Sequence, residues 1–374
     1  MTAVVSKGLE GIAVAQTRIG DVRGDIGQLI YCGYDINELA GKVCFEEVVH
    51  LLWEGRLPNR KELELLQGQL IAARPLPKAV VDMLRLLPKE APPMHVLRTA
   101  VSMLGALDPD ADLNTPQANR RKAVQLVAQL PVITAYFHRL RSGKEPVAPS
   151  PKLNSAANFL YMLNGGPPSD EAAATIDMAF VLHAEHAFNA STFAARVTIA
   201  TLSDMYSAIT SAIGTLKGPL HGGANEGVIH MLQEIGDESR VDDYVRSALA
   251  NKKRIMGIGH RVYKTLDPRA PHLKRLAEKL SAKVGDPKWL RMSERIAAIM
   301  KQEKNLNANV DFYSATVYYS LGIPTDLFTP IFALARMAGW TAHVLEQLAD
   351  NRLIRPLSEY TGPEGLKVVP IDQR

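Results

Sequence analysis

The 374-residue chain is too long for one ordinary hydrophobic core, so its length predicts two domains. Its hydrophobic content of 47% and charged content of 22% are those of a globular protein and exclude a disordered one. Because 43 basic residues face 39 acidic ones, the net charge of +4 gives no support for a nucleic-acid binder.

Cysteine usage and the first residues bear on the compartment. Cys32 and Cys44 are too few for a disulfide framework and lack the spacing of metal ligands. The chain shows no signal-peptide pattern at its start and no apolar stretch long enough to span a bilayer. We therefore expect a soluble, cytoplasmic protein with reduced thiols and no membrane partner.

Helical periodicity dominates the sequence, and strand-like alternation is scarce. Only residues 11–30 suggest a short hairpin, and Asp35 with Glu38 has the pattern of a capping box that opens a short helix. Apolar residues at three- and four-residue spacing predict helices over 45–53, 60–73, 93–106, 119–141, 153–164, 171–187 and 197–215, with Pro-, Gly- or Asp-rich breaks between them. The predicted fold class is all-α.

Two later features concern association between subunits. Residues 326–348 are apolar around nearly the whole helix, and the small-residue segment 194–214 has a similar character. A helix of this kind is buried either in a large core or against a second subunit. We favour an oligomer, and a large monomeric core is the alternative.

The first polar cluster contains His183, Glu185 and His186. Histidines three residues apart share a helix face, and the nearby acid suggests a metal site. The spacing does not match the His-Glu-x-x-His zinc signature, however, and no third ligand is close in sequence. We expect no metal, and a hydrogen-bonded core histidine is the simpler interpretation of either histidine alone.

The second cluster surrounds His221, which has glycines on both sides in residues 218–226. A helix is expected from about Gly222 to Ile235, so His221 would lie near a positive helix end. That location lowers the imidazole pKa and keeps the ring neutral, able to donate a hydrogen bond to a carbonyl. The alternative is a Gly-rich helix start with an incidental histidine.

The third cluster is residues 251–264, which contain five basic side chains, His260 and no acid. Gly257 and Gly259 allow the backbone to approach a ligand closely or to take positive φ. Clustered cations suit an anionic, phosphate-bearing ligand. A solvated basic loop is the alternative, and the two glycines together with Arg269 argue against it.

The fourth cluster combines Asp311 with two later arginines, Arg336 and Arg355. Asp311 lies between apolar residues, where partial desolvation would raise its pKa and make it a usable base. Arg336 lies within the apolar segment 326–348, and a buried guanidinium is costly unless it meets an anion. Either a structural ion pair or a site for a carboxylate ligand would satisfy it.

Taken together, these segments resemble the citrate synthase family. Residues 218–226, 257–270 and 309–314 match that family's three catalytic motifs in order and approximate spacing. Residues 328–336 and 354–356 resemble its later arginine motifs. The resemblance runs over essentially the whole chain, and the ordered set is highly specific although each motif alone is modest.

The resemblance implies a mostly helical homodimer with an active site in the cleft between two domains. The large domain would comprise residues 1–217 and 316–374, and the small domain residues 218–315. The implied reaction is the condensation of acetyl-CoA with oxaloacetate in the tricarboxylic acid cycle. The coenzyme A thioester would be a substrate, and no cofactor or metal is implied.

Residue roles also follow from the resemblance. Asp311 would remove a proton from the acetyl methyl group, His221 would hydrogen-bond the thioester oxygen, and His260 would polarise and protonate the ketone of oxaloacetate. The residues implied to hold oxaloacetate are His186, Arg269, Arg336 and Arg355, the last from the partner subunit. The candidates for coenzyme A binding are Lys252, Lys253, Arg254, Gly257, Gly259 and Lys264.

Two rival functions stay open at this point. A 2-methylcitrate synthase would use propionyl-CoA on the same scaffold, and dual specificity is conceivable because one methylene changes discrimination by only about 1–3 kcal/mol. Methylcitrate enzymes often have proline where Arg261 stands, which favours citrate. A non-catalytic, CoA- or metal-binding helical protein is disfavoured because the chain retains all three catalytic side chains.

Overall fold

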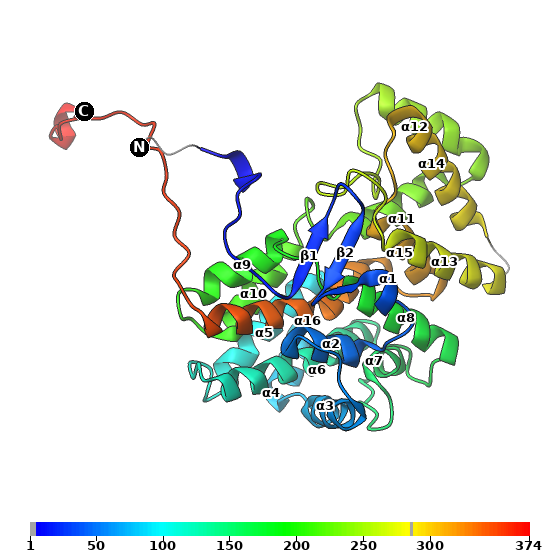
Figure 1. Cartoon of the computed structure of the whole chain (residues 1–374), viewed down its shortest axis with the longest axis horizontal. Coiled ribbons are helices and arrows are strands. Elements are labelled where there is room, and N and C mark those ends of the chain that lie inside the picture. The colour runs from blue at the N-terminus through cyan, green and yellow to red at the C-terminus, as the bar shows by residue number, and fades with distance from the viewer. Residues whose placement is uncertain (1–4, 285–286) are drawn as a thin grey trace.

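The computed structural model describes residues 5–284 and 287–374. Helices make up nearly all of its regular structure, which confirms the all-α prediction (Figure 1). The helices of the first part are α1 Ile36–Leu39, α2 Phe45–Glu54, α3 Arg60–Ala73, α4 Lys78–Leu86, α5 Pro93–Leu107, α6 Pro116–Arg141, α7 Ser155–Asn164, α8 Asp170–His183, α9 Ala190–Ile199 and α10 Met205–Leu216. Those that follow are α11 Ala224–Ile235, α12 Val241–Ala250, α13 Ala270–Val284, α14 Lys288–Lys304, α15 Val310–Ser320 and α16 Phe328–Ala349.

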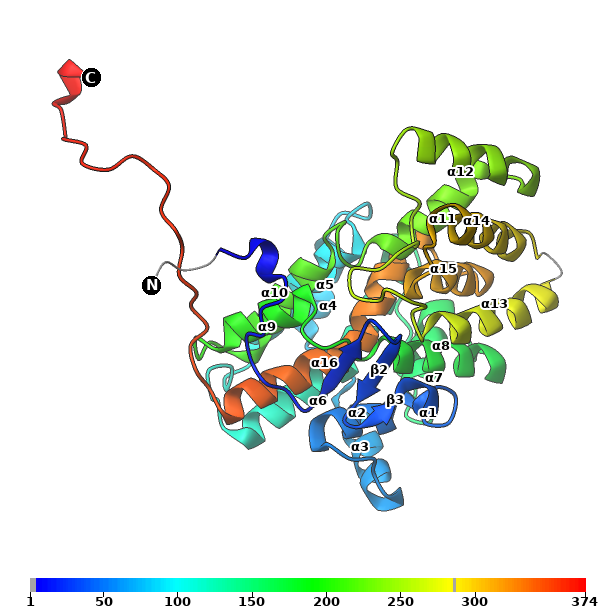
Figure 2. The ribbon, with the colours of Figure 1, turned by 45° about the horizontal axis from the view of Figure 1, so that its top comes forward.

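The molecule separates into two groups of helices (Figure 1, Figure 2). Helices α11–α15 gather at one end, while α2–α10 and α16 form the larger body. The expected domain boundary at residue 218 falls between α10 and α11, and the boundary at residue 316 falls inside α15. The division at these residues stays a prediction. Within the described residues, no helix is long and apolar enough to cross a membrane.

Helix α16 lies at the centre of the larger body and packs against α2, α6, α8, α9 and α10. Its large side chains, among them Trp340 and Phe328, are fully buried. The chain's own core therefore covers this helix, so the apolar character of residues 326–348 is explained without a second subunit. That feature no longer favours an oligomer over a large core.

The predicted hairpin is present but shorter than expected. Strand β1 Gly20–Arg23 pairs antiparallel with β2 Gln28–Tyr31, and β3 Tyr34–Asp35 adds a third strand. The carbonyl of Gly24, at the hairpin tip, accepts a hydrogen bond of 2.8 Å from the backbone N–H of Lys264. A Cβ at Gly24 would collide with the carbonyl oxygen of Val262, so only glycine fits this close approach.

Tertiary contacts override the local pattern in two predicted helices. The helix expected over 171–187 ends at His183, whose carbonyl accepts a hydrogen bond from Arg336 Nε at 2.7 Å. The next carbonyl, that of Ala184, accepts from the backbone N–H of Gly339 at 3.1 Å. Because helix α16 satisfies these carbonyls, the chain leaves the helix, and His183 and His186 do not share a helix face.

The segment predicted as one helix over 197–215 is divided between α9 and α10. The break spans residues 200–204, where Leu202 has a φ of 63° and Asp204 caps α10 through the backbone N–H of Ser207. Helix α4, between Pro77 and Leu87, was not predicted. The capping box at Asp35 does not form, because the Glu38 side chain pairs with Lys42 and does not accept from the backbone N–H of Asp35.

Candidate active site

Six predicted site residues lie where several segments of the fold meet. The charges of Arg269 and Arg336 both act on the pKa values of His186 and Asp311, and the ring centroids of His186 and His260 are 5.4 Å apart. The six residues are His186, His221, His260, Arg269, Asp311 and Arg336. They come from the loops before α9, α11 and α13, the first turn of α15, and the middle of α16.

His221 is held as a neutral hydrogen-bond donor by the start of α9. Its Nε2 lies 2.8 Å from Ser191 Oγ and accepts from the backbone N–H of Ser191 at 3.3 Å. Because a backbone N–H can only donate, Nε2 is an acceptor and Nδ1 carries the ring proton. Burial, followed by the charge of Arg336, lowers the pKa of His221 to about 4. The pKa is lowered as predicted, but burial and the charge of Arg336 are the causes, where the sequence analysis had expected a helix end.

Ser191 follows the first polar cluster in the sequence and was assigned no role there. The residue is fully buried, and its hydroxyl accepts a hydrogen bond of 3.1 Å from Trp340 Nε1. Oδ1 of Asn189, the N-cap of α9, lies 2.7 Å from the same hydroxyl and competes with His221 Nε2 for its single proton. Ser191 is thus fixed from two sides and in turn fixes His221.

His260 is held as a neutral donor by its own loop. Its Nδ1 accepts from the backbone N–H groups of Val262, at 3.0 Å, and Tyr263, at 3.1 Å. The ring proton therefore lies on Nε2. Burial, followed by the charge of Arg269, lowers the pKa of His260 to about 4, so the ring stays neutral at physiological pH.

The loop that carries His260 is joined by hydrogen bonds to the segment before α15. Gly257 and Gly259 have the expected positive φ, 73° and 83°. Their carbonyls accept from Asn309, through the backbone N–H at 2.9 Å and through Nδ2 at 2.9 Å. A Cβ at Gly257 would lie 2.6 Å from Val228 and 2.8 Å from Phe312, so packing requires this glycine. A role for either glycine in binding coenzyme A stays a prediction.

Asp311 is a buried carboxyl group at the start of α15. It is 8% exposed, and its Oδ1 has no hydrogen-bond partner among the described residues. Burial raises the pKa of Asp311 to about 7, although the charges of Arg269 and Arg336 oppose this. The predicted desolvation and raised pKa of Asp311 are confirmed, and its role as a base stays a prediction.

Arg269 is ion-paired within its own loop. Asp267, which is 1% exposed, accepts from Arg269 Nε at 2.9 Å and from Nη2 at 2.8 Å. Burial would raise the pKa of Asp267, but Arg269 keeps it below its ordinary value. The same carboxylate accepts from the backbone N–H of Val310 at 3.1 Å, which links Arg269 to the helix of Asp311. Asp267 lies within the motif of residues 257–270, but the sequence analysis assigned it no role.

Arg336 is 1% exposed and forms no ion pair with a described residue. Its Nε is bonded to the His183 carbonyl, and its guanidinium lies 4.8 Å from the ring centroid of Phe332. Burial lowers the pKa of Arg336 to about 10, and the charge of Glu185 is the largest opposing influence. The charge of Glu185 acts on Arg336 without a direct ion pair, and a role of Arg336 in binding a carboxylate ligand stays a prediction.

Glu185 is a buried carboxylate behind Arg336. His343 Nδ1 is 3.0 Å from Arg196 Nη1, which can only donate, so His343 carries its proton on Nε2 and donates to Glu185 Oε1 at 3.1 Å. The side chain fits because a Cβ at Gly20 would lie 2.9 Å from it and a Cβ at Gly339 would collide with it. No group of three or more potential metal ligands occurs in residues 5–284 and 287–374.

The remaining predicted residues are exposed. Arg355 lies on the segment that follows α16 and extends away from the body, without a hydrogen bond or ion pair to a described residue (Figure 1, Figure 2). A single chain thus does not bring Arg355 to the site. The exposed basic candidates for coenzyme A, close in sequence to His260, are Lys252, Lys253, Arg254 and Lys264.

Comparison with known proteins identifies the family. Residues 8–357 match the family profile described as "Citrate synthase, C-terminal domain". The chain belongs to the citrate synthase family. It is 52% identical to citrate synthase 2 of Bacillus subtilis, over 100% of both chains, and 44% identical to 2-methylcitrate synthase 1 of Corynebacterium glutamicum, over 99% of this chain and 98% of that one. As a member of the citrate synthase family, it is an enzyme that transfers an acyl group in a condensation reaction.

A solved structure in the family matches the whole fold. It is the ternary complex of carboxymethyl coenzyme A and oxaloacetate with citrate synthase from the thermophilic archaeon Thermoplasma acidophilum. The TM-score is 0.94 at 35% identity, over 100% of each chain. The citrate synthase fold therefore extends over the entire length of both proteins.

Proposed function

We propose that this member of the family is a citrate synthase that condenses acetyl-CoA with oxaloacetate. The observation that carries the proposal is the grouping of two neutral histidine donors with one desolvated, unbonded carboxylate. This set suits a reaction in which a carbon acid loses a proton while two carbonyl oxygens gain negative charge.

In the first step, Asp311 takes a proton from the acetyl methyl group. A methyl group beside a thioester is a very weak acid, so the enolate charge must be neutralised as it forms. His221 Nδ1–H donates to the thioester oxygen, and its position against the start of α9 keeps the opposite nitrogen unprotonated. Burial of Asp311 supports this step, because it raises the basicity of the carboxylate.

In the second step, the enol carbon attacks the ketone of oxaloacetate and a C–C bond forms. His260 Nε2–H donates to the ketone oxygen and gives it a proton, so citryl-CoA carries a hydroxyl group. Water then adds to the thioester and gives a proton to His260, while the C–S bond breaks and the leaving thiolate takes the proton held by Asp311, which releases citrate and coenzyme A. We propose that the exposed cations near His260 contact the coenzyme A phosphates.

The charges of the site support a contribution from a second copy of the chain. Asp267 neutralises Arg269, and Glu185 lies within electrostatic range of Arg336, so two buried cations are already matched by two buried anions. Oxaloacetate brings two more negative charges. We propose that Arg355 of the partner subunit supplies the additional cation, because this residue is exposed on a segment that leaves its own body.

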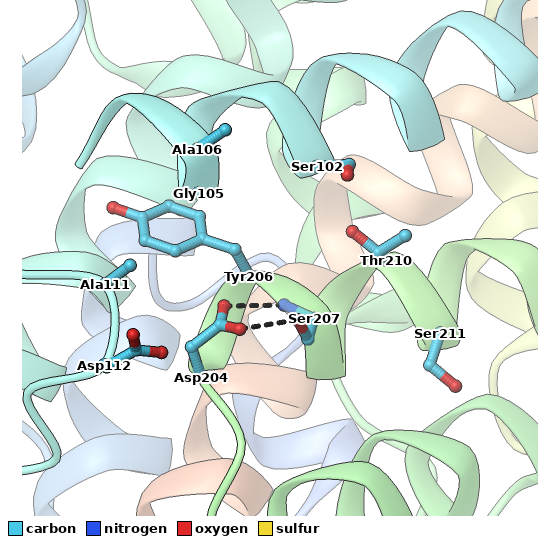
Figure 3. A pocket seen from close by; sticks show the side chains of 10 residues that line it. All are labelled: Ser102, Gly105, Ala106, Ala111, Asp112, Asp204, Tyr206, Ser207, Thr210 and Ser211. Atoms are coloured by element: carbon cyan, nitrogen blue, oxygen red, sulfur yellow. Dashed lines mark hydrogen bonds between the residues drawn. The ribbon is translucent and has the colours of Figure 1, made fainter.

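For the second copy we propose the outer face of α5 and α10, two helices packed side by side. A surface cavity of about 520 Å³ lies between them and is lined by small or polar side chains such as Ser102, Ala106 and Ser211 (Figure 3). Small side chains allow another helix pair to approach closely. Ala106→Arg, measured by light scattering, should produce monomers; an unchanged mass would remove this face from the proposal.

The activity is tested by following thiol release with oxaloacetate and either acetyl-CoA or propionyl-CoA. Asp311→Asn should lower kcat by about 10²–10⁴-fold, since it removes the base but keeps the shape. Absence of thiol release from the wild type with either thioester would refute the enzymatic proposal. A kcat/KM higher for propionyl-CoA than for acetyl-CoA would favour the second candidate, 2-methylcitrate synthase. The 44% identity to 2-methylcitrate synthase 1 of Corynebacterium glutamicum is the reason to test it.

A further inference from the structure

Tyr263 connects the two histidines assigned to oxaloacetate. It is 3% exposed, and its hydroxyl lies 3.3 Å from His186 Nε2. Its backbone N–H donates to His260 Nδ1 at 3.1 Å. The centroid of its ring is 4.6 Å from that of His260 and 5.6 Å from that of His186. One tyrosine therefore touches both imidazoles.

These contacts support both rings, and the backbone N–H of Val262 also holds His260. His186 precedes α9 and His260 precedes α13, so the two histidines belong to different segments and are not hydrogen-bonded to each other. Among the described residues, only Tyr263 is hydrogen-bonded to the ring of His186. The relative placement of the two rings therefore depends on Tyr263.

Other buried tyrosines of the chain differ from Tyr263 in what their hydroxyl groups bind. The hydroxyl of Tyr31 donates to the backbone carbonyl of Glu185 at 2.9 Å, as expected for a residue that ties the fold together. The hydroxyl of Tyr318 is buried without a hydrogen-bond partner among the described residues. The Tyr263 hydroxyl instead meets a side chain of the site, so its removal alters the site more directly than the fold.

We propose that Tyr263 is a positioning residue for oxaloacetate: its hydroxyl orients His186 toward a carboxylate, and its ring and backbone N–H orient His260 toward the ketone. This inference rests on the proposed citrate synthase activity. The two contributions separate in kinetics. The hydroxyl acts on substrate binding through His186, whereas the aromatic ring acts on the chemical step through His260.

Two substitutions distinguish these contributions. Tyr263→Phe removes one hydrogen bond and should raise the KM for oxaloacetate about fivefold, with kcat within about twofold of the wild type. Tyr263→Leu also removes the aromatic contact with His260 and should lower kcat by about tenfold or more. Tyr244→Phe is the matched control, because it removes a tyrosine hydroxyl that donates to Glu234 at 3.0 Å in the same group of helices. Both constants should be unchanged in the control.

A measurement without turnover tests the contacts themselves. In ¹⁵N-histidine spectra of the ligand-free protein, Tyr263→Phe should shift the Nε2 resonance assigned through His186→Gln and leave the Nδ1 of His260 unprotonated. An unaltered His186 resonance would overturn the positioning role, whether or not the enzyme is active. An unchanged oxaloacetate KM in an active enzyme would overturn it as well. A wild type without activity would instead reject the proposed function and, with it, the oxaloacetate part of this inference.

Discussion

Asp267 holds Arg269 by both carboxylate oxygens, through Nε at 2.9 Å and Nη2 at 2.8 Å. Only one edge of the guanidinium is used, and Nη1 has no hydrogen bond to a described residue. Arg269 is therefore fixed in orientation and still has a donor for a ligand. An ion pair within the protein and a binding role for the same arginine are compatible here.

The buried pair should contribute strongly to stability. Asp267→Asn leaves the Arg269 cation without its counterion, and breaking a buried pair in this way costs about 3–5 kcal/mol. Urea unfolding at neutral pH measures the loss. Glu238→Gln is the control, because it breaks an ion pair with Arg291 in which both side chains are about half exposed, and it should cost less than about 1 kcal/mol. Equal losses would contradict a special role for burial.

Activity should depend on one ionisation near neutrality. Asp311 has a pKa of about 7 and acts as a base, so kcat/KM should fall as the pH drops through about 7. His221 and His260, with pKa values of about 4, stay neutral over this range and add no second step. A pH profile of thiol release checks this. An acid limb near pH 4, or two ionisations between pH 5 and 8, would contradict the assignment.

The same carboxyl group should make the folded protein less stable at high pH. Folding raises the pKa of Asp311 above its ordinary 3.8, so its favourable contribution is complete below about pH 4 and is lost as the pH rises through about 7. Asp311→Asn should therefore be more stable than the wild type at pH 8, by roughly 2–4 kcal/mol, and about equally stable at pH 4. Denaturant unfolding at both pH values measures this. A variant less stable than the wild type at pH 8 would contradict it.

Mixing two impaired variants tests whether Arg355 acts across subunits. Arg355→Ala should weaken oxaloacetate binding with the dimer intact, and Asp311→Asn should lack the base. A mixed dimer contains one site with Asp311 and an intact partner Arg355. After the subunits of an equal mixture have exchanged, about half of the dimers are mixed, so the activity should reach about a quarter of the wild-type value. Activity no higher than the average of the two variants would place Arg355 in its own subunit's site or outside the site.

The residue types of the site could be predicted from sequence because they form an ordered set of motifs. His221, His260 and Asp311 were each singled out for a local reason, and the structure groups them. Which ring nitrogen of each histidine carries the proton could not be predicted in the same way. The proton positions depend on backbone N–H groups of Ser191 and Val262, whose directions are set only by the folded loops.

Helix ends could be predicted where local capping residues mark them. They could not be predicted where hydrogen bonds from distant segments end the helix. The helix over 60–73 was predicted with the correct bounds, since Asn59 and Glu62 form a capping box within the segment. The end of α8 at His183 depends instead on Arg336 and Gly339, which lie about 150 residues later in the chain. No local pattern contains that information.

The side chain of Glu185 occupies space beside two glycines that are distant in sequence. Gly20 and Gly339 have no Cβ, and this leaves space for the Glu185 carboxylate. Alanine at position 339 would collide with the Glu185 carboxylate and with the backbone carbonyl oxygen of Ala184, so a smaller residue at position 185 would not by itself make room for it. Substitutions at positions 20 and 185 are coupled, because a Cβ at position 20 meets only side-chain atoms of Glu185 and fits once that side chain is smaller.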